Sequence, residues 1–482
     1  ASISHVASIS KQFTGMSIQL LAQRGKLSLD DEVRKYITEL PDYGTRITIR
    51  HLLTHTSGLR DQWSLLALAG WREDDLITQD DVLKIVAHQK ALNFVPGSEY
   101  LYSNTGFTLL AIIVNRVSGQ SLREFADSNI FKPLGMTHTH FHDDHTMIVP
   151  NRTSAYQPRP GGGWGISIPV FDTYGATSLF TTAEDLLLWE QNFADARVGG
   201  RDLLIAMETP TLLAGGDTSF YGLGLTLGRY RGQRTLGHGG SDAGYRADVV
   251  LFPDQGLAIT ALCNLSSINP NALTRRVANI YLEDVLAVPV ASSASATAPG
   301  VALSAEQLAG LAGLYRNPLT DAVQRFSARD GKLFSGAGPA PGVALTPVSA
   351  TRFLVPGGTN TVEFTAAAGT RPQTMRMLAE GQKPVVFERV TAFTPSAVDL
   401  RGFAGDYTSP ELDITYTLAV SDTVLVVRTR KAADVPMRPT FTDAFQASIG
   451  TVRFTRDARG AITGFTVNTG RVRSLRFERV KS

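Results

Sequence analysis

The chain is short of cysteine, of long apolar runs and of net charge, and each shortage excludes a class of protein. Its single cysteine, Cys263, cannot form an internal disulfide and excludes most cysteine-based metal sites. The longest apolar run, Leu109 to Val114, is far too short to span a bilayer. The formal charge of +2 predicts no strong field for nucleic acid or anionic lipid.

The composition that remains is that of a multidomain globular protein. Hydrophobic residues make up 43% and charged residues 19% of the 482 residues, a length too great for one core. Residues 288–302 are rich in alanine, serine and proline, which indicates a linker. We therefore expect a first domain over residues 1–287 and further domains after the linker.

The chain after the linker repeats itself. Two segments recur at an offset of about 90 residues, which indicates a duplicated module over 303–392 and 393–482. Short alternating apolar runs separated by turns predict that each module is a small antiparallel β-barrel. The recurring segments are Leu311–Tyr315 with Phe403–Tyr407, and Val386–Val390 with Arg476–Val480.

Near the start of the chain, Ser8 and Lys11 have a Ser-x-x-Lys spacing. Apolar residues keep a helical period as far as Gly25, so we expect both side chains on one face of one helix. A serine hydroxyl must lose its proton to a base before it attacks, and a partly buried lysine at a helix N-terminus can be that base. The spacing alone is weak evidence, because it recurs by chance about once in such a chain.

Two later segments carry further polar residues. Tyr102 and Asn104 precede an apolar helix expected over Phe107–Val117, so an extended loop could direct both into one cleft. A core tyrosine beside an asparagine N-cap is the alternative. The glycine-dense segment Thr235–Arg246 leads into two apolar runs that predict a β-hairpin, and its glycines would let a ligand approach closely.

Histidine clusters raise the question of a metal. His51 and His55 have helical i, i+4 spacing, and residues 138–145 contain four histidines and two aspartates. We favour structural and surface roles for these histidines, because no acidic partner lies near the first pair and surface histidines in loops are common. No metal and no cofactor is expected.

Taken in order, Ser8–Lys11, Tyr102–Asn104 and His238–Gly240 resemble the three motifs of the serine β-lactamase and penicillin-binding protein superfamily. The resemblance covers about residues 1–286 and is nearest to the class C-like branch, which includes D-aminopeptidases, DD-peptidases and esterases. It implies an α/β (α+β) catalytic domain, with an antiparallel sheet flanked by helices and a helical subdomain. The barrels resemble those that accompany D-aminopeptidases, in which a loop enters the cleft; Arg428–Lys431 is a candidate for such a loop.

The resemblance also implies roles for single residues. Ser8 would be the acylated nucleophile, Lys11 its proton acceptor and Tyr102 the relay to the leaving group. Asn104 would orient the substrate amide. The backbone N–H groups of Ser8 and Ser241 would form the oxyanion hole.

The third motif departs from many relatives, which carry lysine where this chain has His238. We expect His238, with Gly240 beside it, to bind substrate with only a partial positive charge, because imidazole has a pKa of about 6.5. That favours aminopeptidase, endopeptidase or esterase activity over carboxypeptidase action.

A second departure lies at the N-terminus. Only seven residues precede Ser8, whereas relatives place about fifty, including two strands, before the nucleophile. We expect that an N-terminal segment was lost, cleaved or left out, and a periplasmic or secreted location if a signal peptide preceded it.

Three functions remain open. The first is a peptidase or amidase acting on D-amino-acid substrates through an acyl-enzyme, the second an esterase, and the third a non-catalytic binding protein of the same fold. The expected partner is a small peptide, amide or ester, with no nucleic acid and no membrane span. The oligomeric state is left open.

Overall fold

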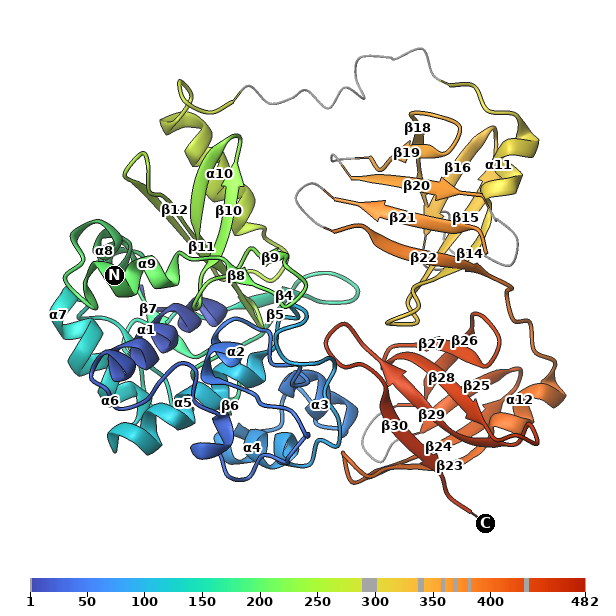
Figure 1. Cartoon of the computed structure of the whole chain (residues 1–482), viewed down its shortest axis with the longest axis horizontal. Helices are drawn as coiled ribbons and strands as arrows, with labels where there is room; N and C mark the ends of the chain where they lie inside the picture. The colour runs from blue at the N-terminus through green and yellow to red at the C-terminus, as the bar shows by residue number, and fades with distance from the viewer. Residues whose placement is uncertain are drawn as a thin grey trace. The chain divides into compact units, whose positions relative to one another are not determined.

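The computed structural model describes residues 2–287, 301–336, 342–356, 360–366, 372–379, 383–428 and 433–481. The chain forms two compact units, residues 1–287 and 288–482 (Figure 1). Most of the predicted linker lies outside the described residues, as do Thr429 to Lys431 of the basic segment. Among the described helices, none combines the length and apolar character that a bilayer-spanning segment needs.

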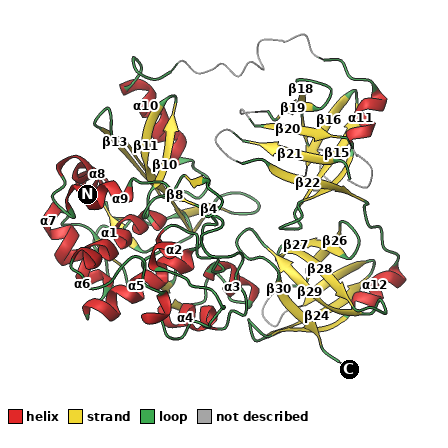
Figure 2. Cartoon of the chain, in the orientation of Figure 1, coloured by secondary structure: helices red, strands yellow, loops and turns green. Residues whose placement is uncertain are grey.

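Helices dominate the first unit (Figure 2). Its α-helices are α1 (Ser10–Gln23), α2 (Ile49–Leu53), α3 (Gln62–Leu68), α4 (Gln79–Ala87), α5 (Asn104–Ser118), α6 (Leu122–Ala126), α7 (Lys132–Leu134), α8 (Ala183–Asp195), α9 (Gly200–Met207) and α10 (Pro270–Tyr281). Shorter helical turns are η1 (Ala7–Ile9), η2 (Val33–Lys35) and η3 (Asp127–Phe131).

A four-stranded antiparallel sheet, in the order β10-β11-β12-β13, forms one wall of this unit. Its strands are β10 (Thr226–Tyr230), β11 (Gln233–Asp242), β12 (Tyr245–Phe252) and β13 (Leu257–Cys263), so the predicted hairpin is confirmed. The side chains of β12 alternate between the two faces of the sheet, and nearly all of them are buried, so both faces are covered. Val249 and Leu251 belong to the main core, whereas Val250 and Phe252 pack with the α10 residues Ala278 and Leu282.

Further short strands complete the unit. β7 (Leu179–Thr181) lies between β1 (Ser4–His5) and β3 (His140–Phe141) in a three-stranded sheet. The remaining pairs are β2 (Ile77–Thr78) with β6 (Phe171–Asp172), β4 (Tyr156–Pro158) with β5 (Trp164–Ile166), and β8 (Thr211–Leu212) with β9 (Thr218–Ser219).

Helix α1 lies in the middle of the core, where it packs against α5. Its residues from Ser10 to Leu21 are all buried, including the polar ones. Gly15 lets the helix lie close to the segment that contains Leu223, because a Cβ at Gly15 would meet the Leu223 carbonyl. The helix that follows Ser8 is therefore held on every side.

Strands dominate the second unit (Figure 2). β14 to β22 form one nine-stranded sheet, and β23 to β30 form a closed barrel. The edge strands β17 (Val343–Ala344) and β18 (Thr346–Pro347) of the first sheet are separated by one residue, so that sheet is nearly closed. The other elements are α11 (Ala305–Leu311), β14 (Gly313–Arg316), β15 (Val323–Arg329), β16 (Lys332–Gly336), β19 (Arg352–Leu354), β20 (Thr361–Thr365), β21 (Thr374–Leu378), β22 (Val385–Val390), α12 (Ala397–Phe403), β23 (Gly405–Ser409), β24 (Ile414–Ser421), β25 (Val424–Arg428), β26 (Val435–Pro439), β27 (Ala444–Ala447), β28 (Gly450–Arg456), β29 (Ile462–Asn468) and β30 (Leu475–Arg479).

The two halves of this unit repeat the same contacts. Tyr315 Oη donates to the Leu311 carbonyl, and Tyr407 Oη donates to the Phe403 carbonyl, both at 2.9 Å. One arginine of each half also donates to an equivalent backbone carbonyl: Arg389 Nη2 to that of Ala312 and Arg479 Nη2 to that of Ala404, both at 2.7 Å. The sequence repeat therefore corresponds to a repeated structure.

Candidate active site

Ser8 does not lie on α1, as the spacing predicted, but in the 3₁₀ turn η1 just before it. Ala7 adopts a left-handed conformation, with φ of 48°, which breaks the helix before Ser8. His5 supports this conformation because its Nδ1 accepts the Ala7 N–H at 3.3 Å. Ser10 also anchors the turn, since its hydroxyl donates to the Ala7 carbonyl at 2.5 Å. The turn leaves Ser8 partly exposed while its neighbours are buried.

Lys11, on the first turn of α1, is fully buried. Its Nζ lies 3.0 Å from Ser8 Oγ and donates to Asn104 Oδ1 at 2.9 Å and to the Ala176 carbonyl at 2.6 Å. The structure thus joins Ser8, Lys11 and Asn104, although 93 residues separate the lysine from the asparagine.

Asn104 is the first residue of α5, whose N-cap is Ser103. Both its backbone N–H and its Nδ2 donate to Asp61 Oδ2, at 2.7 and 2.8 Å. This pairing fixes the amide with its oxygen toward Lys11. Sequence reasoning missed Asp61; its position as N-cap of α3 is a signal for a structural role only.

Tyr102 lies against the same lysine, with its ring centroid 4.8 Å from Lys11 Nζ. The ring of His55 packs on it at 4.2 Å, and His55 Nδ1 accepts the Ser103 N–H at 3.2 Å. His51 Nδ1 likewise accepts a backbone N–H, that of Thr48 at the start of α2. The structural role expected for these two histidines is confirmed.

His238 differs from the expectation, because burial and the nearby Lys11 lower its pKa to about 3. Its Nδ1 lies 2.6 Å from the Gly239 carbonyl, which can only accept, so this nitrogen carries the proton. Its Nε2 accepts the hydroxyl of Tyr221 at 3.0 Å. The imidazole is therefore neutral at pH 7, and the partial positive charge predicted from an ordinary histidine is absent.

β11 brings the third motif against the turn η1, which carries Ser8. A Cβ on Gly240 would meet the carbonyl oxygen of Val6, so only glycine allows this approach. Ser241, the next residue, has an exposed side chain and pairs with Arg246 on β12.

Asp242 ends β11 and carries a carboxyl group close to the site. Its Oδ2 accepts the Thr177 hydroxyl at 2.8 Å and lies 3.9 Å from His5 Nε2. Burial raises the pKa of Asp242 to about 6, a rise opposed by Thr177 and Lys11, so the group is mostly ionised at pH 7.

Comparison with known proteins gives a family match over the first unit. The Beta-lactamase family profile matches residues 1–283. The D-aminopeptidase of Brucella canis is 27% identical over 290 residues, 60% of this chain and 55% of that protein, and the D-aminopeptidase of Brucella anthropi is 28% identical over 259 residues, 54% of this chain and 49% of that protein. The chain thus spans about half the length of these curated relatives.

Solved structures share the fold. The octameric penicillin-binding protein homologue from Pyrococcus abyssi superposes with a TM-score of 0.56 at 21% identity, covering 80% of this chain and 88% of that one. The D-amino acid amidase from Ochrobactrum anthropi SV3, complexed with L-phenylalanine, gives a TM-score of 0.51 at 23% identity over 58% of this chain and 84% of its own. With its profile match over more than half of its length, the chain belongs to the beta-lactamase family.

Proposed function

We propose that this chain is a serine hydrolase that forms an acyl-enzyme on Ser8 and acts on small amides of D-amino acids. The contact of 3.0 Å between Lys11 Nζ and Ser8 Oγ carries the proposal. The D-aminopeptidases among the relatives support the substrate class.

Two hydrogen bonds position the Lys11 nitrogen. Asn104 Oδ1 and the Ala176 carbonyl accept from Nζ and hold it 3.0 Å from Ser8 Oγ. A deprotonated amine held there can take the hydroxyl proton of Ser8. In the proposed first step Lys11 takes this proton while Ser8 Oγ bonds to the substrate carbonyl carbon.

The tetrahedral intermediate would be held by the backbone N–H groups of Ser8 and Ser241. Its carbon–nitrogen bond breaks as Tyr102 donates its phenolic proton to the leaving amine and receives from Lys11 the proton taken from Ser8, so the acyl-enzyme remains with both groups restored. Water then attacks the acyl carbon and gives one proton to Tyr102, which passes it through Lys11 to Ser8 Oγ as the bond between Oγ and the acyl carbon breaks and the acid leaves. Once Lys11 holds the proton from Ser8 it is a cation beside the Tyr102 ring, whereas His238 is neutral.

The charges around the site favour an amide over a free carboxylate as substrate. A neutral His238 gives no charge for binding a substrate carboxylate. Asp242, mostly ionised at pH 7, supplies a negative group suited to the α-ammonium of an amino-acid amide. Both features agree with an aminopeptidase or amidase.

The test compares D-alanine p-nitroanilide with its L-isomer, with its N-acetylated form and with p-nitrophenyl butyrate. We expect turnover of the free D-amide above the other two anilides, and none by Ser8→Ala. Turnover of the ester alone would favour the esterase alternative instead.

An active-site phosphonate identifies the nucleophile directly. Mass spectrometry should find one adduct, on Ser8, in the wild type and in Ser154→Ala, which changes an exposed serine. A folded protein without an adduct on Ser8 would reject both enzymatic functions and leave the non-catalytic binding protein.

A further inference from the structure

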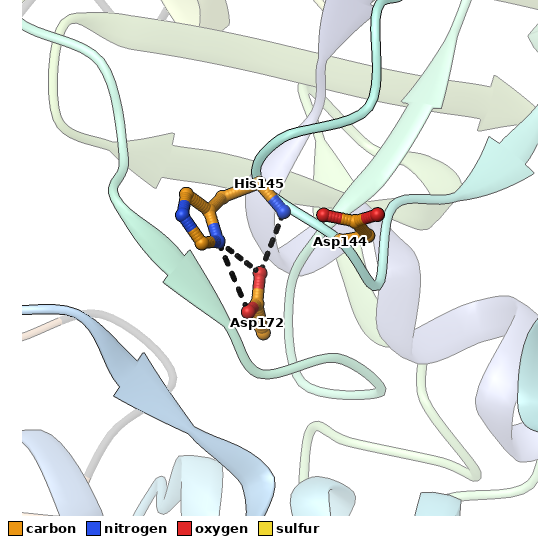
Figure 3. A group of neighbouring side chains, drawn as sticks. All are labelled: Asp144, His145 and Asp172. Carbon is orange, nitrogen blue, oxygen red and sulfur yellow. Dashed lines mark hydrogen bonds and ion pairs between the residues drawn. The ribbon is translucent and has the colours of Figure 1, made fainter.

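A second group of chemically active side chains lies on the loop after β3 and at the end of β6. It consists of Asp144, His145 and Asp172, whose potential ligand atoms all lie within 4.8 Å of one another. Figure 3 shows the Asp172 carboxylate directed at the ring of His145, with the Asp144 carboxylate on the neighbouring part of the loop. The proposed reaction at Ser8 uses none of the three.

Hydrogen bonds hold two of these side chains in place. His145 donates its backbone N–H to Asp172 Oδ1 at 2.6 Å, and its Nδ1 lies 3.0 and 3.1 Å from the two carboxylate oxygens. Asp144 Oδ1 accepts both the N–H and the hydroxyl of Thr146, at 2.8 and 2.6 Å. Within a carboxylate fixed in this way, each oxygen keeps lone pairs for another partner.

A small pocket adjoins His145 and contains a buried histidine. His142 is only 5% exposed, and neither of its ring nitrogens has a hydrogen-bond partner within the described part of the chain. It lines the same small pocket as His145, together with Arg152 and Phe171, whereas Asp144 and Asp172 do not line it. A buried, unpaired imidazole is costly, so the segment that carries His145 has an unsatisfied polar group beside the three side chains.

The charges nearby favour a cation. Asp144 and Asp172 bring two negative charges, and Asp143 is paired with Arg123 at 2.9 Å. The opposing charge is Arg152, whose guanidinium lies over the Phe180 ring at 4.8 Å. The three carboxylates outnumber the two guanidinium groups.

We propose that Asp144, His145 and Asp172 bind one divalent transition-metal ion, for which zinc is the best match. Imidazole and carboxylate together suit zinc, whereas calcium and magnesium prefer oxygen ligands alone. The ion would take the place of a proton on His145 Nδ1, so the neutral ring keeps its proton on Nε2. Bound there, the metal joins the loop after β3 to β6, which pairs with β2, and so stabilises the first unit.

The experiment is a zinc titration of the untagged full chain after treatment with a chelator, followed by calorimetry. We expect one zinc ion per chain and a rise in melting temperature with zinc. His145→Ala and Asp172→Asn should each weaken zinc binding at least about tenfold. Loss of a residue that only hydrogen-bonds to a metal ligand already weakens binding by about that factor, and each of these variants removes a proposed ligand itself. The matched control is His88→Ala, which changes an exposed histidine outside the group and should bind like the wild type.

Two further arms make the outcome decisive. Excess calcium or magnesium should not displace zinc, and Ser8→Ala should bind zinc like the wild type, which separates this site from the proposed catalysis. The proposal is overturned if zinc does not bind, if calcium displaces it, or if His145→Ala and Asp172→Asn, shown by circular dichroism to be folded, bind as tightly as the wild type.

Discussion

At the scale of single residues, Asp61 is linked through Asn104 to Lys11 and so to Ser8, the proposed nucleophile. Its Oδ2 accepts two hydrogen bonds from Asn104, and Asn104 Oδ1 in turn accepts from Lys11. Asp61 is therefore a positioning residue, and losing its charge should disturb the lysine without removing any group that meets the substrate.

We predict that Asp61→Asn lowers kcat/KM about tenfold to a hundredfold, the worth of a hydrogen bond to a charged group. Asparagine still caps α3, so the melting temperature should fall little. Steady-state kinetics and thermal denaturation of Asp61→Asn and the wild type test this prediction. The control is Asp254→Asn, which changes an exposed aspartate and should behave like the wild type. Unchanged kinetics in Asp61→Asn would contradict the positioning role.

The buried His238 makes a prediction about pH. Its pKa is about 3 in the folded protein and about 6.5 when unfolded, so below pH 6.5 the unfolded chain binds the extra proton. The stability that a neutral His238 contributes is complete above pH 6.5 and is lost as the pH falls toward 3.

For one such histidine the loss between pH 6.5 and 5 is about 2 kcal/mol. We therefore expect the melting temperature of His238→Asn to fall less than that of the wild type between pH 7 and pH 5. Burial also lowers the pKa of His5 to about 3. Because of His5, the melting temperature of both proteins should still fall to some extent as the pH falls. Parallel slopes would show that His238 is not neutral in the fold.

At the scale of elements, the site depends on how closely β11 lies against the turn η1. A Cβ at Gly240 would meet the Val6 carbonyl, next to η1, whereas a Cβ at the adjacent Gly239 would have its nearest neighbour at 3.8 Å. Gly240 and Gly239 therefore provide a matched pair of substitutions on one strand, one with a close contact and one without.

We predict that Gly240→Ala moves the strand away from the turn and lowers activity about a hundredfold or more, since a displacement of about 1 Å at a site can have that effect. Gly239→Ala should keep activity within a fewfold of the wild type. Phosphonate labelling rates of both variants measure the difference. Equal rates would mean that close packing of β11 on η1 does not affect the reactivity of Ser8.

At the scale of the whole molecule, every hydrogen bond described for the site lies within the first unit. We predict that a chain ending at Ala287 is still labelled on Ser8 by the phosphonate, at a rate within about threefold of the full chain. Circular dichroism confirms that the shortened chain folds. A folded but unlabelled first unit would show that the second unit is required for acylation.

Patterns within short stretches of the sequence predicted much of the secondary structure and the repeated modules. The hairpin of β12 and β13 and the repeated barrels follow from alternation and internal repetition, which act over a few residues or repeat as units. Helix boundaries were less accurate: the helix expected from Ser8 starts at Ser10, and α5 begins at Asn104 rather than Phe107.

The sequence by itself determined the order and identity of the three motifs, the duplication and the shortage of charge and cysteine. The tertiary structure alone decided which charges exist at the site, because a pKa depends on burial and neighbours. Burial in the core made His238 neutral. Contacts between residues 43 and 27 positions apart placed Asp61 behind Asn104 and brought Asp172 to His145. No local pattern encodes such contacts, since they arise only when distant segments pack together.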